Sequence, residues 1–197
     1  REKQDYLLYL GRIIWRKGVQ VASDVAKATG NKLVVVGQGS LDNPRERLAL
    51  GAEKHIEYHP AVGPEERSRL LGGAKAVLMP TFYLEPFGGV NVEAQLCGTP
   101  VITSDWGAFP ETVLHGVTGF RCRTFEEFCW AVKNIYRIKP ENCRVWAEKN
   151  YSLERVGRMY ETYFQRLHHL FDQGWYQPNE ERQELEWLNR YYQVMTP

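Results

Sequence analysis

The chain has 197 residues, 43% of them hydrophobic, which suffices for one full core but is short for two ordinary domains. Its 25 basic and 24 acidic residues leave a net charge of +1, so no overall field would draw it to nucleic acid or an acidic membrane. The sequence contains no apolar stretch long enough for a transmembrane segment and no C-x-x-C pair among its cysteines. We therefore expect a cytoplasmic protein with free thiols, and its abrupt charged start suggests a piece of a longer chain.

Short apolar runs and helix-like stretches alternate along the first 120 residues or so. The runs at residues 6–10, 32–36 and 76–80 are almost continuous in apolar residues, which is typical of buried parallel strands. The expected strands cover residues 6–10, 32–36, 55–62, 75–80, 100–103 and 119–121. Helices are expected from near Lys17, from Pro64, after Glu85 and from Pro110. This alternation predicts an α/β fold, with a Rossmann-like open parallel sheet and helices on both faces.

From Thr124 onward the sequence is predicted to be helical. Helices are expected over residues 125–136 and 140–149, followed by a longer amphipathic helix from Ser152. After a break at residues 174–178, a last helix is expected to carry Leu185, Leu188 and Tyr192.

Residues 85–93 combine two carboxylates with a glycine pair at a strand-to-helix turn. Gly88 and Gly89 let a ligand approach the backbone, and the free N–H groups of a helix start favour an anion such as phosphate. Glu93, about one turn into the helix, is suited to accept hydrogen bonds from the paired hydroxyls of a ribose. Taken alone, the two glutamates are equally well explained as a solvated surface loop.

Two further loops follow strands at the same edge of the sheet, where doubly wound folds bind ligands. Arg12 and Lys17 are suited to clamp a diphosphate, although two cations are also common in a solvated loop. Gly37-x-Gly39 is half of a dinucleotide fingerprint, and without a third glycine it is a weak signal for NAD. The histidines do not form a metal set, and there is no Asp-x-Asp pair to hold Mg²⁺ or Mn²⁺.

Five sequence blocks stand in the order and spacing found in a large family of retaining glycosyltransferases. They are Gly11-Arg12…Lys17-Gly18, Val36-Gly37-x-Gly39, Glu85-x-Phe87-Gly88…Glu93-Ala94, Gly98-x-Pro100-Val101-Ile102 and Asp105-x-Gly107…Pro110-Glu111…Gly116-x-Thr118-Gly119. From about residue 5 to 171 the chain resembles the C-terminal, donor-binding domain of GT-B fold enzymes that are family 4-like, or group 1. This family includes mannosyl-, glucosyl- and N-acetylglucosaminyltransferases.

The resemblance implies transfer of a hexose from a UDP- or GDP-sugar to an acceptor, with retention of anomeric configuration and without a metal or other cofactor. It implies that Arg12 and Lys17 hold the diphosphate and stabilise the leaving nucleotide, while Glu85 faces the sugar. The positions that it implies for donor binding are Gly11, Gly37, Gly39, Val62, Gly88, Gly89, Val90, Asn91 and Glu93. Asn91 stands where an aliphatic residue is common in the family, so it either reaches a sugar hydroxyl or caps and packs.

The resemblance also implies a domain organisation. Residues 1–173 would form the nucleotide-sugar-binding Rossmann-like domain, which is one half of a GT-B fold. Residues 174–197 would form an aromatic tail helix packed on this domain or on a missing N-terminal acceptor domain. Without that domain, the chain is expected to transfer sugar poorly or not at all.

Three other functions fit the sequence less well. The main alternative is a non-catalytic nucleotide-sugar-binding module of the same fold, although such a module need not retain Arg12, Lys17, Glu85 and Glu93 together. A glycosidase that uses the two glutamates is disfavoured by the parallel-sheet pattern and the two cations. An NAD oxidoreductase is disfavoured by the incomplete glycine fingerprint.

Overall fold

The computed structural model describes residues 3–171, and only the backbone at residues 170 and 171. The described part of the chain divides after Trp146 into two units, residues 3–146 and 147–171. The expected boundary after residue 173 and the expected tail helix with Leu185, Leu188 and Tyr192 lie outside the described residues.

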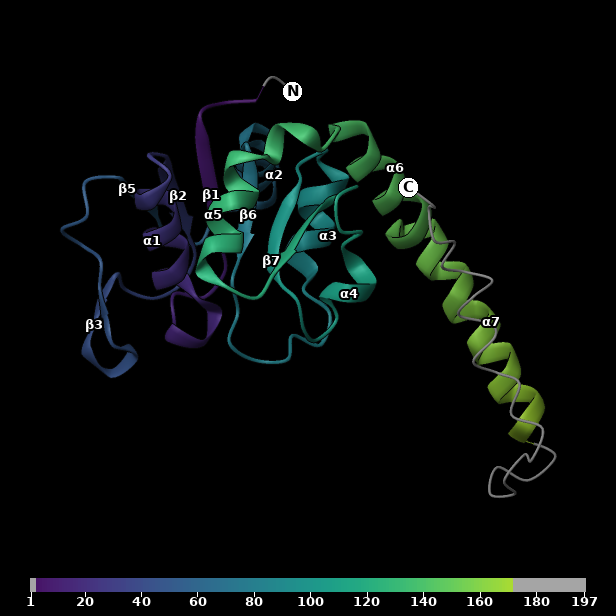
Figure 1. Cartoon of the computed structure of the whole chain (residues 1–197). Helices are drawn as coiled ribbons and strands as arrows, with labels where there is room; N and C mark the ends of the chain where they lie inside the picture. Colours follow the sequence, from purple (N-terminus) through teal and green to yellow (C-terminus); the bar gives the residue numbers. More distant parts are fainter. Residues whose placement is uncertain (1–2, 172–197) are drawn as a thin grey trace. The chain divides into compact units, whose positions relative to one another are not determined.

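A six-stranded parallel sheet forms the centre of the first unit, with the strand order β5-β2-β1-β6-β7-β8 (Figure 1). The strands are β1 (Tyr6–Leu10), β2 (Lys32–Val36), β5 (Ile56–His59), β6 (Ala76–Met79), β7 (Val101–Ser104) and β8 (Gly119–Cys122). The chain runs outward from β1 through β2 to β5 and then returns to the other side of β1 with β6. The strand order therefore reverses between β1 and β6, as in a Rossmann fold.

Each strand of this six-stranded sheet overlaps a segment that was predicted to be a strand. The third strand, β5, is shorter than expected because it ends at His59 rather than at Val62. Pro60 follows, and since proline has no N–H group it cannot continue the hydrogen-bonded ladder.

Helices cover both faces of the sheet (Figure 1). They are α1 (Val19–Ala28) and α5 (Phe125–Lys133) on one face, and α2 (Pro64–Gly73), α3 (Gly89–Leu96) and α4 (Phe109–Thr112) on the other. Within β1, Leu7 packs in the first core cluster and Leu8 in the second. Successive side chains of a strand point to opposite faces, so a strand covered on both faces is apolar throughout.

Short elements complete the first unit. They are three 3₁₀ helices, η1 (Trp15–Lys17), η2 (Pro44–Glu46) and η3 (Ile135–Arg137), and the two-stranded hairpin of β3 (Asp42–Asn43) and β4 (Leu48–Ala49). This hairpin was not predicted. The helix expected over residues 125–136 is split, because α5 ends at Lys133, with Asn134 as its C-cap, and η3 follows. The Asn134 side chain donates to the carbonyl oxygen of Trp130 over 2.9 Å, which satisfies one acceptor of the last turn.

Two further helices follow, α6 (Pro140–Tyr151), which spans the division between the units, and α7 (Leu153–Phe171). They correspond to the helices predicted over residues 140–149 and from Ser152. Within α7, the rings of Tyr160 and Phe164 stack with centroids 6.0 Å apart, as expected for side chains one turn apart. In the described part of the chain, none of the helices combines the length and apolar character required to cross a bilayer. All four cysteines are unpaired.

Candidate active site

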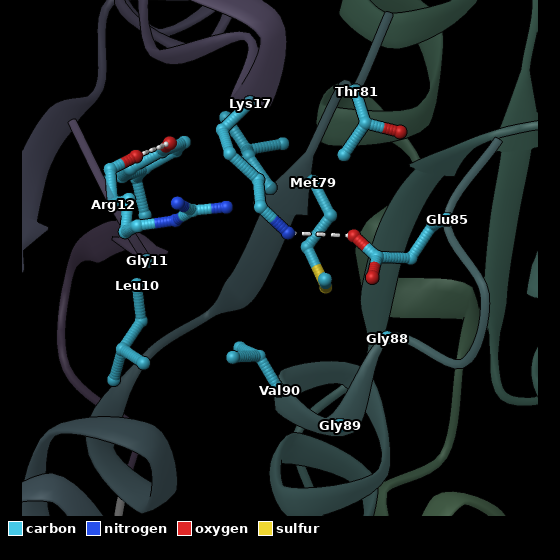
Figure 2. Close-up of a pocket in the computed structure, with 12 residues that line it drawn as sticks. Leu10, Gly11, Arg12, Lys17, Met79, Thr81, Glu85, Gly88, Gly89 and Val90 are labelled. Atoms are coloured by element: carbon cyan, nitrogen blue, oxygen red, sulfur yellow. Dashed lines mark hydrogen bonds and ion pairs between the residues drawn. The ribbon is translucent and has the colours of Figure 1, made fainter. Parts of the chain in front are cut away.

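A pocket of about 190 Å³ lies at the carboxyl ends of β1 and β6, where the strand order reverses (Figure 2). Doubly wound sheets bind their ligands at this point. The predicted site residues that line it are Gly11, Arg12, Lys17, Glu85, Gly88, Gly89 and Val90. The other lining residues are Tyr9, Leu10, Leu78, Met79 and Thr81. The fold thus brings all the predicted catalytic side chains together from two segments that are distant in the sequence.

Two contacts hold the loop after β1. One is a hydrogen bond from Tyr9 to the backbone of the loop, and the other is packing of Gly18 against Pro80, just after β6. The Tyr9 hydroxyl donates to the carbonyl oxygen of Arg12 over 2.7 Å. The C-cap of helix η1 is Gly18, which has a φ of +77°, and a Cβ there would lie 1.9 Å from the carbonyl oxygen of Pro80. Glycine is required because the two backbones touch. This contact holds Lys17 close to the loop that follows β6.

Lys17 and Glu85 form a partly buried ion pair. Lys17 Nζ lies 2.7 Å from Glu85 Oε2, and the side chains are only 21% and 9% exposed (Figure 2). The Tyr83 hydroxyl donates to the same carboxylate oxygen, and Lys17 Nζ lies 4.9 Å from the centroid of the Tyr83 ring. Burial opposes the charge on Lys17, but the hydrogen bonds to Glu85 and Tyr83 outweigh it and raise the Lys17 pKa. Lys17 is therefore a cation at neutral pH.

Arg12 supplies a second positive charge to the pocket. Its side chain is exposed, and its guanidinium points toward the Lys17 ammonium (Figure 2). Among residues 3–171 no hydrogen-bond or ion-pair partner of this guanidinium is found. Its donors are thus available for an anion, and the planar guanidinium suits two oxygens of a phosphate.

The backbone of Glu85 is fixed by the loop after β7. The N–H group of Ala108 donates to the carbonyl oxygen of Glu85 over 2.8 Å. A Cβ at Gly107, which has a φ of +67°, would lie 2.5 Å from the nitrogen and 2.6 Å from the carbonyl oxygen of Glu85. Glycine is therefore required at position 107 of the Asp105-x-Gly107 block, since any side chain would collide with the backbone of Glu85.

The start of α3 borders the same pocket. Gly88 is its N-cap, with a φ of +74°, and no side chain caps the first turn. A Cβ at Gly89 would meet no atom within 4 Å, so open space lies over this residue. The N–H groups of the first turn and the positive end of the helix dipole favour an anion in that space.

Asn91 is fully buried and its side chain is paired inside the protein. Its amide nitrogen donates to Thr112 Oγ1 over 3.0 Å, and its oxygen accepts from Gln95 Nε2 over 2.9 Å. Asn91 does not line the pocket. Of the two roles considered for this side chain, the contacts favour packing over a reach to a sugar hydroxyl.

Gly37, Gly39 and Val62 also lie outside the pocket lining. A Cβ at Gly37 would lie 1.7 Å from the carbonyl oxygen of Gly11, and one at Gly39 would lie 2.8 Å from the Cβ of Ile13. These glycines therefore allow the loops after β1 and β2 to pack closely. Val62 is half-buried against the core of the face covered by α2, α3 and α4.

Glu93 lies outside the pocket lining and pairs with Arg67 of α2. Arg67 Nε and Nη2 each lie 2.5 Å from Glu93 Oε2, and the two side chains are 36% and 42% exposed. The contact leaves the other oxygen, Oε1, with no partner among the described residues. Sequence reasoning missed Arg67, because nothing in its local pattern identifies a partner 26 residues away.

Tyr83 was also missed, because the chain bends at residues 82 and 83 beyond the end of β6, so no strand alternation places its hydroxyl on the Glu85 carboxylate.

A Ser–His–Glu arrangement occurs elsewhere but has no access to substrate. Ser23 Oγ lies 3.1 Å from His55 Nε2, and His55 Nδ1 lies 3.4 Å from Glu53 Oε2. Ser23 is only 1% exposed within α1, and the same His55 nitrogen is 3.1 Å from the Ser23 carbonyl oxygen. We assign a structural role to this arrangement. The described residues also contain no group of three or more His, Cys, Asp or Glu side chains placed to hold a metal ion.

Comparison with known proteins places the chain in a family. Residues 1–153 match the family described as glycosyl transferases group 1. The chain belongs to this family. Among curated relatives, this group 1 chain is 34% identical to a glycogen synthase of Mycobacterium tuberculosis over 126 residues, which are 59% of this chain and 30% of the relative. It is 30% identical to an uncharacterized glycosyltransferase of Methanocaldococcus jannaschii over 143 residues, 68% of this chain and 36% of the relative.

Solved structures share the fold of this chain. AviGT4, which is involved in avilamycin A biosynthesis, is 25% identical with a TM-score of 0.74, over 84% of this chain and 52% of AviGT4. The Anabaena protein HepE, solved in complex with UDP-glucose, is 19% identical with a TM-score of 0.69, over 83% of this chain and 49% of HepE. The group 1 chain thus spans about a third of the length of its curated relatives and about half of these structures. The predicted family and the Rossmann-like half of a GT-B fold are confirmed.

Proposed function

We propose that this chain is the donor-binding domain of a glycosyltransferase, which moves a hexose from a nucleoside-diphosphate sugar to an acceptor with retention of anomeric configuration. The observation that carries the proposal is the convergence of Arg12, Lys17 and the start of α3 on one pocket beside Glu85. Three sources of positive potential at one place suit a ligand with two phosphates.

The chemistry follows from these charges. As the sugar–phosphate bond breaks, negative charge develops on the leaving nucleoside diphosphate, and Lys17 and Arg12 are placed to stabilise it. In this proposal the two side chains supply the charge that the diphosphate requires, so donor binding needs no metal. The Glu85 carboxylate, held by its backbone contacts at the other side of the pocket, accepts hydrogen bonds from the sugar hydroxyls.

We also propose which nucleotide the donor carries, which residues bind it and where the acceptor binds. HepE was solved with UDP-glucose, and the shared fold favours a UDP-sugar, with a GDP-sugar as the second candidate. Glu93 would bind the ribose, while the loop after β2 with Gly37 and Gly39, together with Val62, would line the base. We propose that acceptor binding belongs to an N-terminal domain of a longer protein, and that this protein works in the cytoplasm, where unpaired cysteines persist.

Calorimetric titration of the 197-residue chain with UDP, UDP-glucose, GDP and ADP tests the donor site. Wild-type protein should bind one nucleotide series selectively, and Lys17→Ala should weaken that binding at least tenfold, since it removes a charged contact to phosphate. Lys27→Ala is the matched control, because Lys27 also pairs with a glutamate, Glu53, at 3.0 Å, but lies outside the pocket. Equal affinity of the two variants would contradict the donor site.

Turnover is tested in the longer protein, with an acceptor and with the anomeric configuration of the product read by NMR. Lys17→Ala should slow transfer there by two or more orders of magnitude. Nucleotide binding without any transfer would instead favour the non-catalytic sugar-nucleotide module.

A further inference from the structure

One oxygen of the Glu85 carboxylate accepts hydrogen bonds from two side chains, Lys17 and Tyr83. In the proposed function, Lys17 also has to bind the diphosphate. Lys17 Nζ lies 2.7 Å from Glu85 Oε2, and the Tyr83 hydroxyl donates to that atom as well. When a diphosphate enters the pocket, Lys17 has to face the phosphate oxygens. Glu85, which is only 9% exposed, would then be a nearly buried carboxylate without its cation. A buried charge that loses its partner is strongly unfavourable.

We propose that Tyr83 is a positioning residue that holds the Glu85 carboxylate toward the pocket while Lys17 exchanges it for the donor diphosphate. The inference rests on the proposed function for the exchange itself. The structural part of the inference applies to the protein without ligand. It states that the hydrogen bond from Tyr83 to Glu85 contributes more to stability when Lys17 is absent.

The segment that carries Tyr83 and Glu85 is anchored independently of Lys17. Thr81 is 1% exposed, its hydroxyl lies 3.2 Å from Ser104 Oγ in β7, and its carbonyl oxygen accepts from the same Ser104 hydroxyl over 2.9 Å. At the other end, Ala108 N–H donates to the Glu85 carbonyl oxygen over 2.8 Å. Moving the Lys17 side chain therefore leaves both ends of this segment fixed, and Tyr83 stays within reach of Glu85.

Two features suit Tyr83 to this role. Burial and the hydrogen bond to Glu85 raise the Tyr83 pKa, so the hydroxyl keeps its proton and remains a donor at neutral pH. The Lys17 ammonium also lies 4.9 Å from the centroid of the Tyr83 ring. An aromatic face attracts a cation even when no carboxylate is nearby. The Tyr83 ring therefore keeps Lys17 near the pocket when Lys17 leaves Glu85.

A thermal double-mutant cycle tests the structural part without any ligand. The melting temperature is measured for the wild type, Tyr83→Phe, Lys17→Met and the double variant. Tyr83→Phe should lower it at least twice as much in the Lys17→Met background, where Tyr83 is the remaining donor to Glu85. In a Glu85→Gln background the effect of Tyr83→Phe should shrink below its value in the wild type. Equal shifts in all three backgrounds would overturn the proposal.

Titration with UDP and UDP-glucose tests the link to the sugar. Tyr83→Phe should leave the affinity for UDP within about twofold and weaken that for UDP-glucose by about tenfold, because Glu85 is displaced while Lys17 and Arg12 remain. Tyr6→Phe is the control, since the Tyr6 hydroxyl donates to the Leu70 carbonyl oxygen over 2.7 Å, outside the pocket. Equal loss for both ligands in Tyr83→Phe would mean that Tyr83 only supports the fold. Failure of the wild type to bind either would count against a UDP-sugar donor, while the thermal cycle would still decide the role of Tyr83.

Discussion

Gly107 determines where Glu85 lies, so Gly107→Ala should damage both the stability of the fold and the pocket. Gly107 and Gly116 both have a positive φ, of +67° and +79°. In this conformation, a residue with a Cβ is destabilised by about 1–2 kcal/mol relative to glycine. At Gly116 nothing lies within 4 Å of an added Cβ, whereas at Gly107 the Cβ would lie 2.5 Å from the Glu85 nitrogen and 2.6 Å from its carbonyl oxygen.

The two glycines therefore form a matched pair that separates backbone strain from crowding. Gly116→Ala should lower the free energy of unfolding by about 1–2 kcal/mol, through strain alone. Gly107→Ala should lower it by about 3–5 kcal/mol, because the backbone of Glu85 has to move by roughly an ångström and its hydrogen bond to Ala108 N–H is lost.

Urea denaturation followed by circular dichroism measures both effects under one set of conditions. Titration of the same proteins with UDP-glucose should show weaker binding for Gly107→Ala and wild-type affinity for Gly116→Ala. If the two variants unfold with free energies that agree within about 0.5 kcal/mol, contact with Glu85 does not explain Gly107, and our account of how Glu85 is positioned fails.

Three further changes have defined outcomes. Glu93→Gln should reduce the preference for UDP over 2′-deoxy-UDP in calorimetric titration, and Arg67→Gln should do so by less than tenfold; an unchanged preference in the Glu93 variant would exclude the ribose contact. Asn91→Ala should lower the free energy of unfolding in urea by about 2–3 kcal/mol, since it leaves buried polar partners unpaired, and a loss below 1 kcal/mol would show that the network matters little. Burial lowers the pKa of Lys3 from 10.5 to about 8, so the folded chain holds this proton more weakly than the unfolded chain. Wild-type stability relative to Lys3→Met should therefore rise by about 1 kcal/mol as pH increases from 8 to 10.5, after a discount for partial exposure, and a flat difference in urea unfolding would contradict this.

Local pattern sufficed for most of the fold. The strands β1, β2 and β6 are largely apolar runs that end at a glycine or a proline, and since burial on both faces demands such runs, they are visible in the sequence. The β3–β4 hairpin escaped prediction because its two-residue strands, Asp42–Asn43 and Leu48–Ala49, are too short to show any periodicity. The helix expected over residues 125–136 was too long, because α5 ends at Lys133 and the chain continues as the 3₁₀ helix η3.

For the pocket, the sequence predicted where the main residues lie but not which side chains contact each other. Arg12, Lys17 and Glu85 follow the ends of predicted strands, so the sequence alone determined that they would meet at one edge of a parallel sheet. The tertiary structure decided which groups meet side chain to side chain: Lys17 with Glu85, 68 residues apart, and Arg67 with Glu93, 26 residues apart. The reason is physical. Periodicity and turn chemistry act between neighbours in the chain, whereas a hydrogen bond or an ion pair depends on distances that exist only after the sheet and its helices have packed.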